Sequence, residues 1–146
     1  MVSKTPKRTH HTTRRRSRRH GDYEYELIRK MLSLTTMLRL YHWDTMSYAT
    51  HKATGELYEK LDGKLDMLVE LFVGKKDKVF DRRRFRTLHI ENVTSNGKLR
   101  THIQHFIKML ERMDSHVDKT SDTDLLNLRD EIIADSNQFL YLLRLK

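Results

Sequence analysis

The sequence predicts an all-α protein: a bundle of four amphipathic helices that follows a basic N-terminal tail. Of the 146 residues only Pro6 is a proline, so nothing after the tail breaks a long helix. Apolar residues recur every three or four positions in four separate segments. The first 21 residues contain eight lysines and arginines and no acidic residue. A chain of this length is enough for one domain with a single core.

The first two predicted helices follow one another closely. One covers Tyr23 to about Tyr48, and the next covers about Thr50 to Val73, where Gly74 is expected to end it. Residues 1–21 lack an apolar period, so we expect a disordered tail there and the bundle over residues 22–146. The apolar positions of the two helices are Leu27, Met31, Leu34, Leu38, Tyr41, Leu57, Leu61, Leu65, Leu68 and Phe72.

A basic connector over residues 75–96 precedes the third helix. Connectors of this length usually cross over a bundle or carry function, and a short helical turn is expected around Phe80–Arg86. Ser95-Asn96-Gly97 is expected to open the third helix, and Ser121 with Asp124 resembles a capping box before the fourth. The apolar positions of these two helices are Leu99, Ile103, Phe106, Leu110, Met113, Val117, Leu125, Leu128, Ile132, Phe139 and Leu142.

The composition excludes several classes of protein. There is no cysteine, so disulfides and thiol chemistry are excluded. No apolar run approaches the roughly 20 residues that span a bilayer, and the basic N-terminus lacks the apolar segment of a secretory signal. We therefore expect an intracellular protein of the cytoplasm, nucleoid or nucleus, with no membrane partner.

The positive charge is concentrated in the tail. The net charge is +9, and the tail holds eight of the 29 basic residues and none of the 20 acidic ones, so the bundle is nearly neutral. A lysine or arginine that meets a phosphate releases counterions, which gives salt-sensitive binding to any sequence. We expect the tail to bind DNA or another polyanion; a solubilising or nuclear-targeting tail is the alternative. The residues concerned are Lys4, Lys7, Arg8, Arg14, Arg15, Arg16, Arg18 and Arg19.

A second basic run lies in the connector, at residues 82–86. This run is expected to be either a solvated loop or a second segment that contacts phosphate groups. Arginine-rich tails spaced by serine and threonine also resemble those on proteins of large DNA viruses, so a virion is an alternative setting.

Two histidines and two carboxylates form a candidate metal site. Imidazole and carboxylate ligands suit iron, manganese or zinc. The nine steps from His42 to His51 turn about 900° on one helix, which places these residues on opposite faces. They converge only if the chain breaks between Asp44 and Thr50. Asp66 and Glu70 are four residues apart and share one face of the second helix.

The spacing along the second helix decides how such a site is built. Fifteen residues separate His51 from Asp66, a rise of roughly 22 Å, which no metal ion bridges. One site therefore requires two chains, and the simplest arrangement is a two-fold pair of antiparallel second helices with two equivalent sites. The alternative is an ordinary solvated face, because five polar residues of this helix lie together opposite its leucine stripe. They are His51, Glu59, Asp62, Asp66 and Glu70.

The stretch from His42-Trp43 through His51 to Asp66 and Glu70 resembles the Dps-type mini-ferritins of the ferritin-like superfamily. Their pattern has His-Trp near the end of the first helix and a histidine early in the second. An aspartate follows fifteen residues later, and a glutamate four residues after that. The resemblance implies a ferritin-like bundle with a crossover connector between helices two and three. It also implies a dodecameric homo-oligomer built from two-fold dimers.

The resemblance also implies an activity. In that family ferrous iron is oxidised, usually by peroxide, at an intersubunit di-metal site, and the ferric mineral is stored in the shell. His42 and His51 would bind metal from one subunit, Asp66 and Glu70 from the other, and Trp43 would lie near the metals. Zinc or manganese are alternatives to iron. Basic N-terminal arms in that family often bind DNA, which suits the tail.

Two other hypotheses stay open. One is a non-enzymatic DNA-packaging or virion protein on the same fold, and the other is a bundle whose partner is another protein. The sequence also departs from the family pattern. The two histidines are nine residues apart where about twelve are usual, so the helices must join differently. Gly55 stands four residues after the second histidine, where the family often has an acidic ligand.

Overall fold

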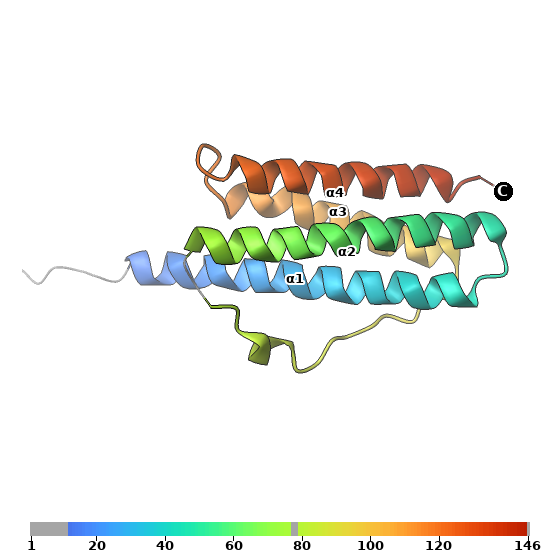
Figure 1. The fold of residues 1–146 in the computed structure, drawn as a ribbon, viewed down its shortest axis with the longest axis horizontal. Helices are drawn as coiled ribbons and strands as arrows, with labels where there is room; N and C mark the ends of the chain where they lie inside the picture. Colours follow the sequence, from blue (N-terminus) through green and yellow to red (C-terminus); the bar gives the residue numbers. More distant parts are fainter. Residues whose placement is uncertain (1–11, 77–78, 146) are drawn as a thin grey trace, which may run out of the picture.

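The computed structural model describes residues 12–76 and 79–145, and within them it contains helices and no strand. The predicted all-α class with four helices is confirmed. The four α-helices are α1 (Thr12–Asp44), α2 (Tyr48–Lys76), α3 (Asn96–Glu111) and α4 (Thr123–Leu142). Two short 3-10 helices, η1 (Arg82–Phe85) and η2 (Arg112–Ser115), complete the described part of the chain (Figure 1). No helix among the described residues is long and apolar enough to cross a membrane.

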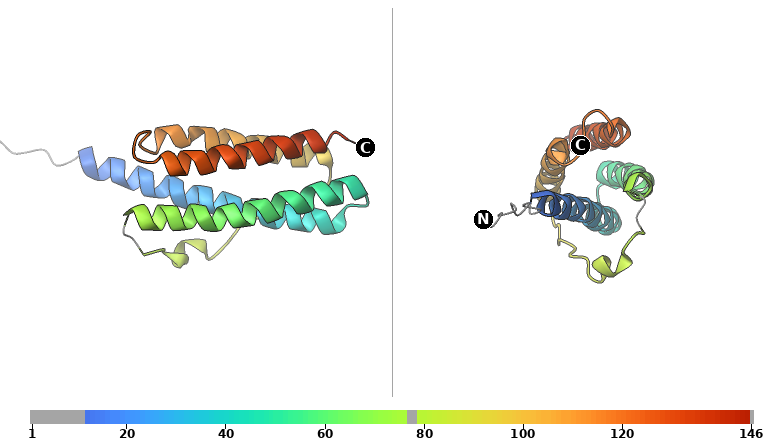
Figure 2. Two further views of the ribbon diagram at one scale, coloured as in Figure 1. Left: turned by 45° about the horizontal axis from the view of Figure 1, so that its top comes forward. Right: turned by 90° about the vertical axis from the view of Figure 1, so that its left-hand side faces the viewer.

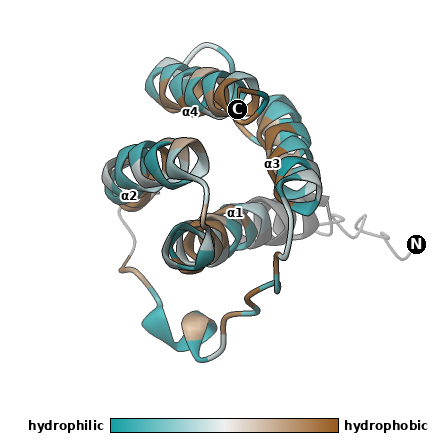
Figure 3. Cartoon of the chain, turned by 90° about the vertical axis from the view of Figure 1, so that its right-hand side faces the viewer, coloured by the Kyte–Doolittle hydropathy of each residue, from teal (hydrophilic) through white to brown (hydrophobic). Residues whose placement is uncertain are grey.

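The four helices lie side by side around one core. Seen end-on, α1 lies next to α2 and α3, and α4 closes the ring opposite α1 (Figure 3). The chain runs in one direction along α1, returns along α2, and then runs along α3 in the same direction as α2 (Figure 1). Residues 79–95 pass along the outside of α1 to reach the start of α3 (Figure 2).

The core is built from the apolar residues that the sequence periodicity predicted to be buried. Leu27, Leu61, Phe106 and Ile132, one from each helix, are fully buried. Removing a side chain of this size from water contributes about 1.5–3 kcal/mol, so the shared apolar face holds the helices together. Of the predicted core positions only Tyr41, Val117 and Leu142 are partly buried.

The N-terminal boundary differs from the prediction. α1 begins at Thr12 and not at Tyr23, so residues 12–21 are helical where a disordered tail was expected. The physical reason is that this stretch contains no proline, and arginine has a good helix propensity. The rest of the predicted tail, residues 1–11, lies outside the described residues.

The end of α2 also differs. The helix continues through Gly74 to Lys76, because Lys75 holds its last turn against the α3–α4 connection. The Nζ atom of Lys75 donates to the carbonyl of Ser121 at 2.8 Å and forms ion pairs with Asp122 at 3.3 Å and Asp124 at 2.9 Å. A glycine alone therefore does not end this helix.

The predicted cap of α3 is confirmed and that of α4 is wrong. Ser95 is the N-cap of α3, and its hydroxyl accepts from the backbone N–H of Lys98 at 3.3 Å. Before α4, Ser121 instead donates its backbone N–H to the carboxylate of Asp118 at 3.0 Å, and Asp122 is the N-cap residue. Backbone hydrogen bonds from Ser121 and its neighbour hold the pKa of Asp118 below its ordinary value.

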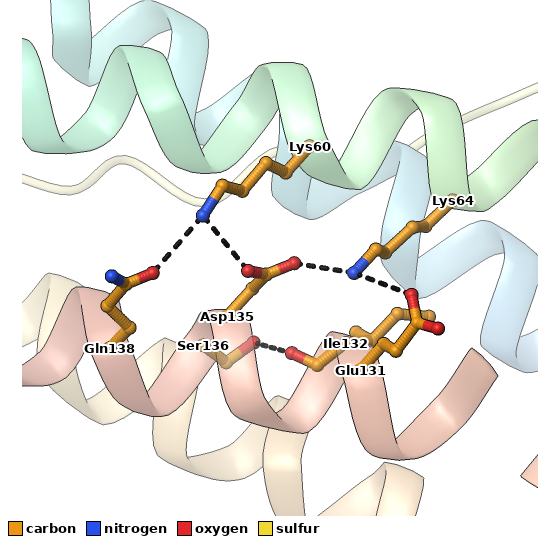
Figure 4. A network of polar contacts seen from close by, with 7 residues as sticks. All are labelled: Lys60, Lys64, Glu131, Ile132, Asp135, Ser136 and Gln138. Carbon is orange, nitrogen blue, oxygen red and sulfur yellow. Dashed lines mark hydrogen bonds and ion pairs between the residues drawn. The ribbon is translucent and has the colours of Figure 1, made fainter. Parts of the chain in front are cut away.

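A polar network joins α2 to α4 (Figure 4). Asp135 accepts from Lys60 at 3.0 Å and from Lys64 at 2.7 Å, and its side chain is only 16% exposed. Lys60 also donates to Gln138 at 3.1 Å, and Lys64 pairs with Glu131 at 3.2 Å. Burial alone would raise the pKa of Asp135, but the two lysines outweigh it and lower the pKa. The network sets the register of the two helices.

Candidate metal-binding site

The connection between α1 and α2 decides whether the two histidines can meet. α1 ends at Asp44 and α2 begins at Tyr48, so the chain breaks within the predicted interval. Ser47 organises the turn: its carbonyl accepts from the N–H of His51 at 2.8 Å and its hydroxyl from the N–H of Thr50 at 3.3 Å. The turn therefore reverses the chain over three residues, 45–47, without a glycine.

His42 and His51 lie face to face across this turn. Their ring centroids are 3.7 Å apart and the rings are inclined by 21°. Nδ1 of His42 lies 2.7 Å from the carbonyl oxygen of His51, and Nδ1 of His51 lies 3.0 Å from the carbonyl oxygen of His42. A carbonyl oxygen only accepts, so each Nδ1 carries the hydrogen. Each neutral ring then keeps the lone pair of its Nε2, the atom through which imidazole binds a metal.

Side chains of both α1 and α2 continue the contacts of His42. The ring of Tyr58 meets His42 edge-on, with centroids 5.4 Å apart and planes at 84°. The guanidinium of Arg39 lies 4.7 Å from the centre of the Tyr58 ring and also pairs with Asp62. The sequence reading missed the role of Arg39, although its spacing of three residues from His42 places it on the same side of α1.

The structure explains the glycine at position 55. A Cβ atom there would lie 3.1 Å from Cε1 and 3.4 Å from Nδ1 of His42. The His42 ring therefore occupies the space that a side chain at position 55 would need. This chain cannot place an acidic ligand there while the two histidines keep their present contact.

Asp66 and Glu70 lie on α2, both exposed, on one face of the helix. Within the described residues neither carboxylate has an ion-pair or hydrogen-bond partner, whereas Asp62 one turn earlier is paired with Arg39. α2 is unbroken between His51 and Asp66, so the two pairs stay roughly 22 Å apart. The structure brings the histidines together and the carboxylates together, but does not join the two pairs in one chain.

A site built from both of these pairs would need a second chain. In the described part of the protein, no three side chains of the histidine, aspartate or glutamate type are grouped so that they could hold a metal ion. The histidine pair supplies two nitrogen donors and the carboxylate pair supplies oxygen donors. Together they make the mixed set that suits iron, manganese or zinc.

Large apolar side chains are exposed beside both pairs. Trp43 is 68%, Met46 100% and Tyr48 78% exposed around the α1–α2 turn. Met67, between the two carboxylates, is 52% exposed. Trp43 is thus not a core residue, and grouped exposed apolar side chains commonly mark a surface that another molecule covers.

The predicted nucleic-acid-binding residues fall into two groups. Lys4, Lys7 and Arg8 lie outside the described residues. The other five belong to the first turns of α1, and they are Arg14, Arg15, Arg16, Arg18 and Arg19.

Comparison with known proteins gives a family and no function. A family described as "Family of unknown function (DUF5856)" matches residues 42–143. This range begins at His42 and includes every candidate metal ligand and helices α2 to α4. No curated protein and no solved structure matches the chain significantly. The chain belongs to the DUF5856 family.

Proposed function

We propose that this member of the DUF5856 family is a Dps-like mini-ferritin. It oxidises ferrous iron at sites shared between two copies of the chain, and it binds DNA through its basic N-terminal residues. The observation that carries the proposal is the His42–His51 pair, in which both Nδ1 atoms are bound to carbonyls and both Nε2 atoms are left for metal. Histidines that bind metal commonly hold their other ring nitrogen in this way.

The proposal includes the ferritin-like topology. α2 and α3 run in the same direction and are joined along the outside of the bundle (Figure 1). A long crossover of this kind distinguishes ferritin-like bundles from bundles with short connections only.

The proposed dimer follows from the register of α2. Two antiparallel copies bring His51 of one chain beside Asp66 and Glu70 of the other only if the two-fold axis passes near residue 59. The same register sets Tyr48 of one copy opposite the region of Met67 in the other. The exposed apolar side chains at both places then cover each other, which gives the dimer a hydrophobic contribution. Each dimer contains two equivalent sites, and six such dimers would form the twelve-subunit shell.

The chemistry assigned to the site is the oxidation of its substrate. Each of two ferrous ions loses one electron, and hydrogen peroxide takes up both electrons and two protons to become two molecules of water. His42 and His51 bind iron through Nε2, and Asp66 and Glu70 of the second copy bind it through oxygen and balance its charge. The carbonyl–Nδ1 bonds hold both rings in one orientation. Zinc or manganese would bind the same donor set without being oxidised in this way.

Iron oxidation by the full chain tests the proposal. Ferrous iron is added anaerobically, peroxide follows, and the appearance of ferric iron is timed for wild type and for Asp66→Ala/Glu70→Ala. We expect wild type to exceed the uncatalysed rate and the double variant to fall to it. Glu111→Ala, which removes an exposed carboxylate on α3, is the matched control and should behave as wild type. A wild-type rate equal to the uncatalysed one would exclude the enzymatic role and leave the non-enzymatic DNA-packaging role standing.

The DNA-binding part rests on charge. Eight basic residues and no acid precede residue 22, and five of the arginines lie on the first turns of α1. In an assembled shell many copies of this segment act together, so a modest affinity per copy becomes strong overall. The proposal includes an intracellular setting, in the cytoplasm, nucleoid or nucleus, with a virion as the alternative.

A further inference from the structure

The basic run of the connector is fixed to α1. The hydroxyl of Tyr25 accepts from the backbone N–H of Asp81 at 2.9 Å, and Arg29 donates to the carbonyl of Arg84 at 2.6 Å. The ring of Tyr25 also lies 5.8 Å from that of Phe80 and 5.6 Å from that of Phe85. We call residues 81–86 the arginine turn. Its backbone is held by α1 at both ends, so it is not a freely solvated loop.

The arginine turn presents its charge outward. It contains one acid and four arginines, and all four arginines are exposed. Asp81 accepts from Nε of Arg83 at 2.8 Å, and this hydrogen bond holds the pKa of Asp81 below its ordinary value, so the carboxylate stays charged. Arg84 lies over the ring of Tyr25 at 4.1 Å. Among the described residues Arg82 and Arg86 have no ion-pair partner. The turn therefore has a net charge of +3 within six residues.

We propose that the arginine turn is a docking surface for the phosphate backbone of duplex DNA. This rests on the proposed function and adds a second contact to its DNA-binding segment. Exposed guanidinium groups bind phosphate in a bidentate manner, and a turn already held in place loses little entropy when it binds. The positive charges that remain on the turn repel each other until an anion neutralises them.

Two features favour a duplex as the partner of the arginine turn. The aromatic rings of the turn, Phe80 and Phe85, are half-buried and packed on Tyr25, so they cannot stack with bases. The other basic segment, residues 14–19, precedes Tyr25 on the same helix by only about 9 Å along the axis. A duplex carries one charge per about 1.7 Å, so phosphates are available over the whole distance between the two segments.

Salt-dependent DNA binding tests the proposal. Anisotropy of a short labelled duplex of mixed sequence is measured with the full chain over a range of salt concentrations, for wild type and for Arg82→Gln/Arg86→Gln. Neither arginine holds the turn, so the variant should fold as wild type, and a thermal melt checks this. Because each lost phosphate contact lowers the slope of log K against log salt by about 0.9, we expect the slope to fall by about two. Affinity at physiological salt should fall about ten- to a hundred-fold.

The matched control is Arg112→Gln/Arg144→Gln, which removes the same charge from exposed positions on η2 and after α4. Its salt slope should stay close to that of wild type. A turn variant that behaves like this control overturns the proposal. So does a variant that keeps its duplex binding but loses binding to a single strand or to phosphatidylserine vesicles.

Iron oxidation is measured on the same turn variant. An unchanged rate with weakened DNA binding supports both proposals. An unchanged rate with unchanged DNA binding removes the docking surface and leaves the metal site intact, so the two failures are distinguishable.

Discussion

His42 and His51 stack at a centroid separation of 3.7 Å, and each ring nitrogen Nδ1 is bound to the backbone carbonyl of the other residue. The two side chains therefore close the α1–α2 turn, and in each ring Nδ1 is occupied by a backbone carbonyl. Their arrangement depends on the absence of a side chain at position 55, and this dependence can be measured.

Replacing Gly55 by alanine should disturb the histidine pair. The new Cβ would lie 3.1 Å from Cε1 of His42, so the ring must move and its hydrogen bond to His51 weakens. Weakening such a bond offsets the gain in helix propensity, so we expect Gly55→Ala to be about 1 kcal/mol less stable than the alanine variant of Gly63. Chemical denaturation measures this, and iron oxidation should slow in parallel.

Gly63→Ala is the matched control for that change. Gly63 lies on the same helix, and nothing lies within 4 Å of its added Cβ. This variant should gain about 0.5–1 kcal/mol, because alanine is the better helix former. An equal gain in stability for both alanine variants would contradict the close contact between His42 and position 55.

Asp135→Asn should weaken the α2–α4 interface at neutral pH. Its hydrogen bonds with Lys60 and Lys64 involve charged partners, and the variant should lose about 1–2 kcal/mol of unfolding free energy. The folded-state pKa of Asp135 is lowered, so its contribution is present above the ordinary value of 3.8 and disappears as pH falls through the lower folded pKa. The difference between variant and wild type should therefore close in acid.

The control for this comparison is Glu111→Gln, whose carboxylate is exposed on α3. Its stability at neutral pH should match that of wild type. A constant difference between Asp135→Asn and wild type down to acid pH would contradict the assigned ion pairs.

Tyr23→Phe should remove a late tyrosine titration. The buried hydroxyl of Tyr23 donates to the carbonyl of Met109 at 2.9 Å, and burial raises its pKa from 10.0 to about 12. The variant should lose about 1 kcal/mol at neutral pH. Because the unfolded chain ionises first, wild type should lose stability between pH 10 and 12 more steeply than the variant. Tyrosinate absorbance and denaturation follow both effects, and identical alkaline profiles would place the hydroxyl in water.

Much of the fold was predictable because each helix has an apolar face of regular period. From the sequence, His42 and His51 were expected to meet only if the chain broke between them. The position of that break depends on Ser47, whose hydroxyl accepts from the backbone N–H of Thr50. The helical span of residues 12–21 was not predicted, because arginine-rich polar sequence has no apolar period to reveal a helix.

The remaining differences depend on contacts between segments distant in the sequence. Gly74 was expected to end α2, but Lys75 binds the turn before α4 and extends the helix. Ser121 was expected to cap α4, but Asp118 binds its backbone first. The need for glycine at position 55 likewise depends on a ring from another helix. Local sequence patterns cannot predict any of these contacts.

Subunit mixing tests the central claim, that the metal site is shared between chains, most directly. His42→Ala/His51→Ala and Asp66→Ala/Glu70→Ala are each expected to be inactive. When equal amounts are dissociated and reassembled together, half of the dimers contain both variants, and each of these has one intact site of two. If the site is shared, the mixture should recover about a quarter of the wild-type rate of ferrous iron oxidation. A mixture as inactive as its two components, although wild type is active, would contradict a shared site.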